Sequence, residues 1–301
     1  MADRKRSTAA QQPIGIAPPG FRLPDATRIG RVRLQVRDLA RSVAYYERAL
    51  GLRMLERIDH SALLGPSDGP VIIELNELPG AHPVPRRGLL GLYHFAVLLP
   101  DRASLGKFVS HLAQIKERAG MSDHLVSEAI YLTDPDGLGI EVYADRPRET
   151  WILEERQIAM TSKPLDAADL RASARGERWT GAPAGTVIGH VHFHVGDIDK
   201  ASGFYHAALG FDKIVWSYPG ALFMSAGGYH HHVGANTWAA GSPVAAANDA
   251  KLLDWELILP DRGSVENAAR SVEESGFAVD RTEADPVATD PWGIRVRLRA
   301  A

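Results

Sequence analysis

The sequence predicts an α+β fold built from four βαβββ modules. Two observations support this fold class: a long internal repeat, and a switch from strand-type alternation to a helical pattern inside each copy. The segment 29–38 (IGRVRLQVRD) recurs as 188–197 (IGHVHFHVGD), and 94–101 (HFAVLLPD) recurs as 254–261 (DWELILPD). Because self-similarity of this kind marks a repeated structural unit, we number the modules 1 to 4 by these opening segments.

Each module is predicted to open with a strand and to continue into an amphipathic helix. In module 1 apolar and polar residues alternate over 32–36, which is typical of a strand with one buried face. Behind it, Val43, Tyr46 and Leu50 follow one another at spacings of three and four, which predicts a helix with one apolar side.

Glycines mark the ends of the predicted helices and the start of the closing strands. Gly51 and Gly210 stand where a helix C-cap needs a positive φ. The segments 133–137 (TDPDG) and 289–293 (TDPWG) are typical of turns, and 140–143 reads as the closing strand of module 2. The predicted organisation is a tail over 1–28, a domain over 29–145, a connector over 146–186 and a domain over 187–301.

Composition excludes several classes of protein. The chain has 301 residues, 34 Lys and Arg against 37 Asp and Glu, and no cysteine. A formal charge of -3 gives no basic footprint for nucleic acid. The absence of cysteine excludes disulfides, thiolate zinc sites, iron–sulfur clusters and a cysteine nucleophile. Without a long apolar run, we expect no membrane association. Residues 1–20 have no apolar core of a signal peptide, which predicts the cytoplasm.

Histidines are concentrated on one face of the strand that opens module 3. His190, His192 and His194 alternate with apolar residues, so they point away from the core toward a cleft or the inside of a curved sheet. Comparison of the modules puts His94 and His190 in equivalent positions of the opening strands, and Glu141 in the closing strand of module 2. Modules 1 and 4 carry Arg31, Asp254 and Arg297 in the corresponding positions.

Two imidazoles and one carboxylate form the facial triad of non-haem Fe(II) oxygenases. His94, His190 and Glu141 are therefore candidate metal ligands. The alternative from the residues alone is a hydrogen-bonded core histidine at 94 and a solvated edge residue at 141.

A motif across 124–141 gives the pattern a family resemblance. The spacing His124-x5-Ile130-Tyr131-x2-Asp134-Pro135-x-Gly137-x3-Glu141 resembles the signature of extradiol ring-cleavage dioxygenases. The four-module pattern over 29–145 and 187–299 resembles the vicinal-oxygen-chelate superfamily, which includes glyoxalases, bleomycin-resistance proteins and extradiol dioxygenases. The resemblance implies a catechol 2,3-dioxygenase-like enzyme.

The resemblance also implies roles for particular residues. Glu141, His94 and His190 would hold Fe(II), with Mn(II) left open as a substitute. His124 and Tyr131 would hydrogen-bond the catecholate oxygens. The segment 228–232 (GYHHH) resembles the one that carries the acid–base histidine, and His231 matches best, although strand alternation groups His230 with His232. The implied partners are a small aromatic diol and O2, and an oligomer of identical chains is left open.

The same resemblance predicts two paired, curved mixed-sheet half-barrels of the glyoxalase and extradiol dioxygenase type. Because the ligands fall in modules 2 and 3, we expect these two modules to form the active cavity, and modules 1 and 4 to form a metal-free barrel. Trp216, Phe223 and Trp238 are candidates either for a pocket around the substrate ring or for the core.

Three alternative functions remain at this level. A glyoxalase-like lyase or isomerase would use Zn or Ni with four ligands, and His232 could be the fourth. A metal-free small-molecule-binding protein of the bleomycin-resistance type would not need His94, His190 and Glu141. A purely structural protein is the third alternative, since modules 1 and 4 already lack candidate ligands.

Overall fold

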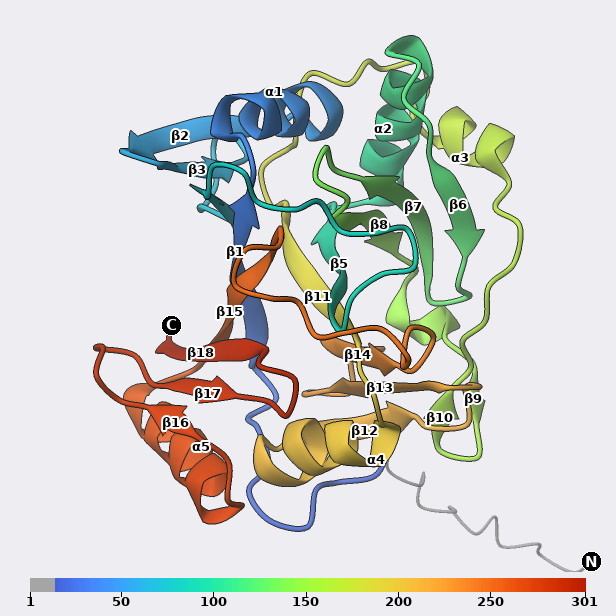
Figure 1. Cartoon of the computed structure of the whole chain (residues 1–301). Coiled ribbons are helices and arrows are strands. Elements are labelled where there is room, and N and C mark those ends of the chain that lie inside the picture. Colours follow the sequence, from blue (N-terminus) through green and yellow to red (C-terminus); the bar gives the residue numbers. More distant parts are fainter. Residues whose placement is uncertain (1–13) are drawn as a thin grey trace, which may run out of the picture.

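The structure, a computed structural model that describes residues 14–301, contains two eight-stranded mixed sheets. Figure 1 shows them side by side, the strands of modules 1 and 4 in one sheet and those of modules 2 and 3 in the other. Each module has the order strand, helix and three strands, which confirms the predicted fold class. The pairing of modules 2 with 3 and 1 with 4 also agrees with the prediction.

The first sheet joins modules 1 and 4 through the antiparallel pair β1 and β15. Its order is β16-β17-β18-β15-β1-β4-β3-β2. The strands are β1 (Arg28–Val36), β2 (Arg53–Ile58), β3 (Ser61–Gly65), β4 (Ile73–Glu77), β15 (Lys251–Leu259), β16 (Val279–Asp280), β17 (Val287–Thr289) and β18 (Arg295–Ala300).

The second sheet joins modules 2 and 3 through the antiparallel pair β5 and β11. Its order is β12-β13-β14-β11-β5-β8-β7-β6. The strands are β5 (Gly91–Leu98), β6 (Gly120–Asp123), β7 (Ser127–Thr133), β8 (Gly139–Asp145), β11 (Val187–His194), β12 (Asp212–Val215), β13 (Ala221–Ser225) and β14 (Val233–Asn236).

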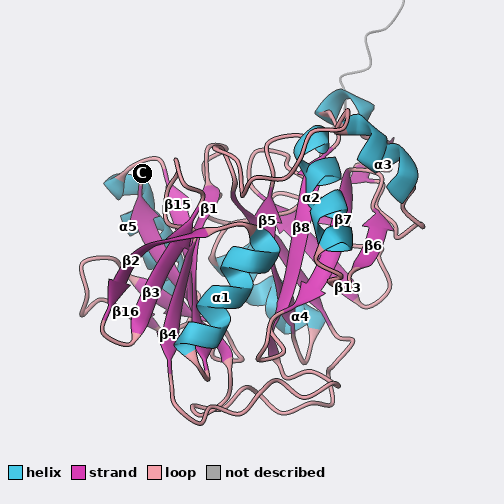
Figure 2. Ribbon diagram, turned by 90° about the horizontal axis from the view of Figure 1, so that it is seen from above, coloured by secondary structure: helices cyan, strands magenta, loops and turns pink. Residues whose placement is uncertain are grey.

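Helices connect the first and second strand of every module. They are α1 (Leu39–Leu50), α2 (Arg102–Gln114), α4 (Ile198–Ala201) continued by the π-helix η2 (Ser202–Ala208), and α5 (Arg262–Glu274). Figure 2 shows α1 crossing the space between β4 and β5, where the Tyr46 ring stacks on Phe95. No helix among residues 14–301 is long and apolar enough to span a membrane.

An aspartate caps the helix of every module. Asp38, Asp101, Asp197 and Asp261 have extended backbones, and each carboxylate accepts the N–H three residues further on. A capping carboxylate satisfies a free N–H and faces the positive end of the helix. The repeated segments found in the sequence end on these aspartates, so the repeat encodes the change from strand to helix. The predicted positive φ occurs at Gly51 (65°) and Gly210 (99°).

The connector between the two halves contains α3 (Ala167–Ser173), the short 3-10 helix η1 (Arg148–Thr150) and a two-stranded hairpin of β9 (Leu153–Glu154) and β10 (Gln157–Ile158). The predicted tail lies partly outside the described residues, and within the described part Ile16 forms a β-bridge with Lys213. Each sheet takes strands from both halves of the chain. The predicted domains 29–145 and 187–301 therefore describe the repeated halves of the sequence, and whether they are separate structural domains stays a prediction.

The main core lies between the two sheets. Val191, Phe193 and Val195 are fully buried, and the Phe193 ring lies 6.1 Å from that of Trp255 on β15. The opposite face of β11 carries the histidines, which therefore lie on the concave side of the second sheet. This alternation is the one that the sequence predicts.

Candidate metal centre and catalytic pocket

Three strands of the second sheet bring His94, Glu141 and His190 together. In the register of the sheet, His190 on β11 lies opposite Ala96 on β5, and Ala96 lies beside Glu141 on β8. His94 precedes Ala96 by two residues and projects from the same face of the sheet. The small Ala96 side chain leaves space for its longer neighbours to converge.

The three side chains are within reach of a single ion. The Nε2 atoms of His94 and His190 lie 3.0 Å and 3.2 Å from Oε2 of Glu141. One ligand atom of each residue lies within 4.8 Å of the other two, and within residues 14–301 this is the group of His, Asp and Glu with metal-binding geometry. All three side chains are buried.

The protonation states suit a metal site. Burial raises the pKa of Glu141, but His190 and His94 lower it by more, so its pKa lies well below the ordinary value. Burial lowers the pKa of His190 to about 4 despite the neighbouring carboxylate. A carboxylate and a neutral imidazole are the forms that coordinate a divalent cation.

His94 has buried nitrogens that the described residues leave without a hydrogen bond. Although Nε2 lies 3.0 Å from Glu141, its direction is wrong for a hydrogen bond, and neither ring nitrogen finds a partner in residues 14–301. Leaving such atoms unsatisfied is costly. Two imidazoles and a carboxylate are the donor set of mononuclear Fe(II) oxygenases, so these residues fit a divalent transition-metal ion.

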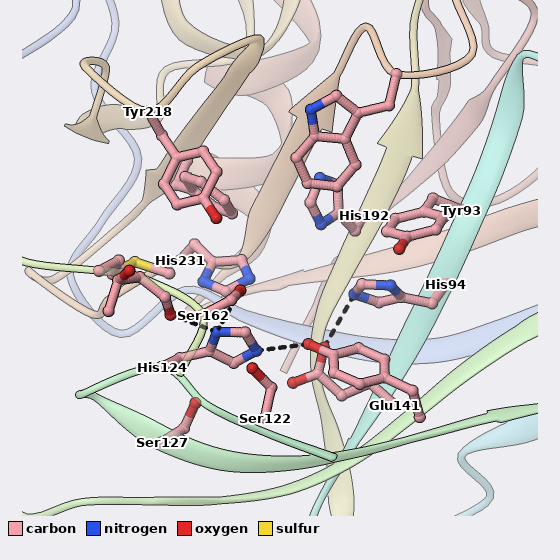
Figure 3. A pocket seen from close by; sticks show the side chains of 15 residues that line it. Tyr93, His94, Ser122, His124, Ser127, Glu141, Ser162, His192, Tyr218 and His231 are labelled. Atoms are coloured by element: carbon pink, nitrogen blue, oxygen red, sulfur yellow. Dashed lines mark hydrogen bonds and ion pairs between the residues drawn. The ribbon is translucent and has the colours of Figure 1, made fainter. Parts of the chain in front are cut away.

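A pocket opens on the concave side of the second sheet next to this cluster (Figure 3). His94 and Glu141 line the pocket, whereas His190 is not among the lining residues. One part of its wall is aromatic and is formed by Tyr93, Tyr218, Phe223 and Trp238. Another part is polar and is formed by Ser122, His124, Ser127, Thr161 and Ser162.

His124 and Tyr131 form a hydrogen-bonded pair at the pocket. His124 Nδ1 lies 2.7 Å from the carbonyl oxygen of Thr161, which can only accept, so Nδ1 carries the proton. Nε2 of the neutral ring therefore accepts from the Tyr131 hydroxyl, 2.6 Å away. Burial, reinforced by the charge of Glu141, raises the pKa of Tyr131 well above its ordinary value. The phenol thus stays protonated, and its proton points to His124.

His231 lines the pocket at the end of a hydrogen-bonded chain. Its ring centroid lies 4.0 Å from that of His190. His231 Nδ1 lies 2.8 Å from His230 Nδ1, and His230 Nε2 lies 2.9 Å from Oδ1 of Asp145. His230 and His232 are absent from the lining of the pocket, so of the three consecutive histidines the structure brings His231 to the cavity.

Two candidates from the sequence lie elsewhere in the described structure. His232 Nδ1 accepts the N–H of Ala226, and its ring packs on Tyr229, so a fourth ligand at this position has no support. Trp216 packs against the main core and is outside the lining, whereas Phe223 and Trp238 line the pocket.

Several residues that line the pocket were not predicted from the sequence. His192 was grouped with His190 on one face, but received no role. The same alternation that selected His190 could have selected it. Met160 and Thr161 of the connector also line the pocket, and nothing in the sequence pattern indicates how the connector folds back over the sheet.

The concave face of the first sheet carries ion pairs at the positions equivalent to the ligands. Arg33 lies 2.6 Å from the fully buried Asp254, which also faces Arg297 at 3.6 Å. Arg31 lies 3.0 Å from Glu256. These guanidinium groups lie on the face that corresponds to the ligand face of the second sheet, where their positive charge would repel a cation.

This fold and this site define a class. The chain belongs to the glyoxalase/bleomycin resistance protein/dioxygenase superfamily, whose family model matches residues 28–142 and 187–298. It is 43% identical to Catechol-2,3-dioxygenase of Bacillus subtilis (strain 168) over 269 residues, which cover 88% of this chain and 94% of the relative.

Solved structures support the fold. A structure from Bacillus subtilis subsp. subtilis str. 168 matches with a TM-score of 0.63 at 14% identity, covering 93% of this chain and 86% of the other. Glyoxalase I from Zea mays matches with a TM-score of 0.54 at 19% identity, covering 91% and 92%. Both likenesses concern the fold alone.

Proposed function

We propose that the chain is an extradiol dioxygenase, which cleaves the ring of a catechol-type substrate beside its two hydroxyl groups with Fe(II) and O2. The convergence of His94, Glu141 and His190 beside a lined pocket carries the proposal. The similarity of this chain to Catechol-2,3-dioxygenase over most of both chains supports the same reaction class. Mn(II) stays an alternative ion for this donor set, and the cytoplasm stays the predicted location.

His94, Glu141 and His190 would hold the ion. When bound, Fe(II) supplies Lewis acidity and electron exchange between an aromatic diol and dioxygen. The donor set leaves coordination positions open for both reactants. The aromatic residues Tyr218, Phe223 and Trp238 give a flat ring an apolar wall to stack on.

The pair of His124 and Tyr131 gives the pocket an oriented hydrogen-bonding group next to the proposed metal site: the Tyr131 hydroxyl donates to His124 Nε2, and its oxygen can accept from a diol hydroxyl group. Because Thr161 fixes the tautomer of His124, the pair keeps its orientation before substrate arrives. An acceptor that is already oriented positions a diol hydroxyl group without reorganisation. We assign the pair to the diol oxygens.

His231 is the proposed acid–base group. In the neutral form of His230, donation from Nε2 to Asp145 leaves Nδ1 as an acceptor, so His231 donates to it from its own Nδ1. Nε2 of His231 is then the nitrogen that can take a proton from a substrate hydroxyl group in the pocket. Asp145 and His230 act as positioning residues, because they select this tautomer, as the aspartate does in a Ser-His-Asp triad.

Oxygen uptake with a panel of catechols tests the proposal. The purified protein, loaded with Fe(II) under anaerobic conditions, is expected to consume O2 and to form a yellow ring-opened product. Glu141→Ala is expected to lose both iron and uptake, whereas Glu283→Gln, at an exposed partner of Arg297 between β16 and β17, keeps both. Uptake that survives the loss of Glu141 would refute the triad.

A further inference from the structure

A second buried network borders the pocket and has no part in the proposed proton chemistry. Asn236 at the end of β14 lies between two histidines of β11. Its Oδ1 lies 2.7 Å from His194 Nδ1, and its Nδ2 lies 3.0 Å from His192 Nε2. Asn236 is fully buried, and the His192 side chain lines the pocket.

The orientation of the Asn236 amide is fixed by a backbone group. The N–H of Trp238, which can only donate, lies 3.1 Å from Oδ1. The oxygen must therefore face Trp238 and His194, and the amide nitrogen must donate to His192 Nε2. Since His192 Nε2 accepts, the neutral ring carries its proton on Nδ1.

The Nδ1–H group of His192 has no acceptor among residues 14–301. Asn236 supplies the hydrogen bond that His192 makes within residues 14–301. The unpaired nitrogens of His94 and His190 are completely sealed, but His192 Nδ1 is not among the sealed atoms, and its residue faces the cavity. Figure 3 shows the His192 ring beside Tyr93 and His94. A donor in this position is open to an acceptor on a molecule that enters the pocket.

The surroundings select the kind of acceptor. The ring of His192 lies among those of Tyr93, Phe223 and Trp238, at centroid distances between 5.3 Å and 5.8 Å. The residues that line the pocket include Glu141 but no Lys or Arg. Burying a carboxylate without a cation is costly, whereas a neutral oxygen needs only the donor.

We propose that His192 donates from Nδ1 to a neutral oxygen acceptor on the ring of the substrate, so that the enzyme selects catechols with an acyl or alkoxy substituent over their alkyl or alkenyl counterparts. The inference rests on the proposed dioxygenase function, which it deepens by naming the substrate class. In this assignment His192 determines specificity, and Asn236 positions it.

The test compares acetylcatechol with isopropenylcatechol, which has nearly the same shape but lacks the acceptor oxygen, using both the 3- and the 4-substituted isomers. The measured quantity is the ratio of the two kcat/KM values for each variant of the Fe(II)-loaded protein. The electronic effect of the acetyl group is common to all variants, so a change in this ratio reports the contact.

Two substitutions separate the two nitrogens of His192. Glutamine places its amide near Nε2 and loses the Nδ1 donor, so His192→Gln is expected to lower the ratio about threefold to tenfold for at least one isomer. Asparagine places its amide nitrogen near Nδ1, so His192→Asn is expected to recover most of the ratio. The matched control is His206→Gln. The His206 imidazole forms a hydrogen bond with the Phe211 carbonyl away from the pocket, so this substitution is expected to leave the ratio as in the wild type.

Anaerobic binding of the same compounds, followed by tryptophan fluorescence, gives a readout that does not need turnover. An unchanged ratio in His192→Gln, in both kinetics and binding, overturns the assignment. Failure of every catechol to support oxygen uptake refutes the proposed function instead, and the binding ratio then still reports on His192.

Discussion

The hydroxyl group of Tyr46 donates a hydrogen bond of 3.2 Å to Oδ2 of Asp134, from α1 in module 1 to the turn of module 2. Tyr205 and Asp290 repeat this bond at 3.0 Å between modules 3 and 4. Each half of the chain thus ties together two modules that belong to different sheets. Burial raises the pKa of both aspartates to about 6.

The first prediction concerns the pH dependence of this bond. Because the folded pKa of Asp134 lies above its ordinary value of 3.8, its contribution to stability falls as the pH rises from about 4 to 6. Tyr46 stabilises the ionised form, so Tyr46→Phe is expected to lower the free energy of unfolding by about 1–2 kcal/mol at pH 7 and by less at pH 5. Urea unfolding at both pH values measures the difference, and equal losses would contradict it.

The second prediction concerns the chain that ends at His231. Asp145→Asn no longer compels His230 to donate from Nε2, so His231 can adopt the wrong tautomer. We expect kcat to fall on the order of tenfold, with iron content, melting temperature and KM close to the wild type. Asp169→Asn, an exposed partner of Arg102, is the control. A change in KM alone, with kcat retained, would speak against a tautomeric role.

The third prediction uses two glycines. A Cβ atom on Gly234 would lie 2.8 Å from Cγ of His192, whereas one on Gly203 would meet nothing within 4 Å. Gly234→Ala is therefore expected to displace His192 and to lower the free energy of unfolding by about 1–3 kcal/mol. Gly203→Ala, inside a helix, is expected to raise it by about 0.5–1 kcal/mol. Denaturant unfolding of both variants checks the contrast in sign.

The fourth prediction concerns the ion pairs of the first sheet. Arg33→Met leaves the fully buried Asp254 with a distant partner, Arg297 at 3.6 Å. We expect a loss of about 3 kcal/mol in the free energy of unfolding, without loss of iron or oxygen uptake. Arg48→Met breaks an exposed pair with Glu117 and is expected to change stability little. Loss of iron in Arg33→Met would show that the two concave faces are coupled.

The fold was predictable because each copy of the repeat contains the residues that determine its local structure. Each opening segment ends on a helix-capping aspartate such as Asp38 or Asp197, and strand alternation fixes which face of β11 is buried. The crossed pairing of modules followed from a second constraint: His94 and His190 can share one ion only if β5 and β11 belong to the same sheet.

The rest of the site depends on long-range contacts that leave no periodic signal. The Thr161 carbonyl that orients His124 comes from the connector, which has no repeat to compare with. Strand alternation alone could not choose among the histidines of the run 230–232, because these residues lie in the irregular segment before β14. There the chain turns, and neighbouring side chains point to different environments.

The crossed pairing of modules has a consequence for how the protein can be divided. Cleavage inside the connector would leave one fragment with His94 and Glu141 and another with His190. Each fragment would contribute four strands to each of the two sheets. Neither fragment alone could assemble the donor set. Reassociation of the fragments and recovery of metal binding should therefore occur together. The metal ion would then promote association of the two fragments.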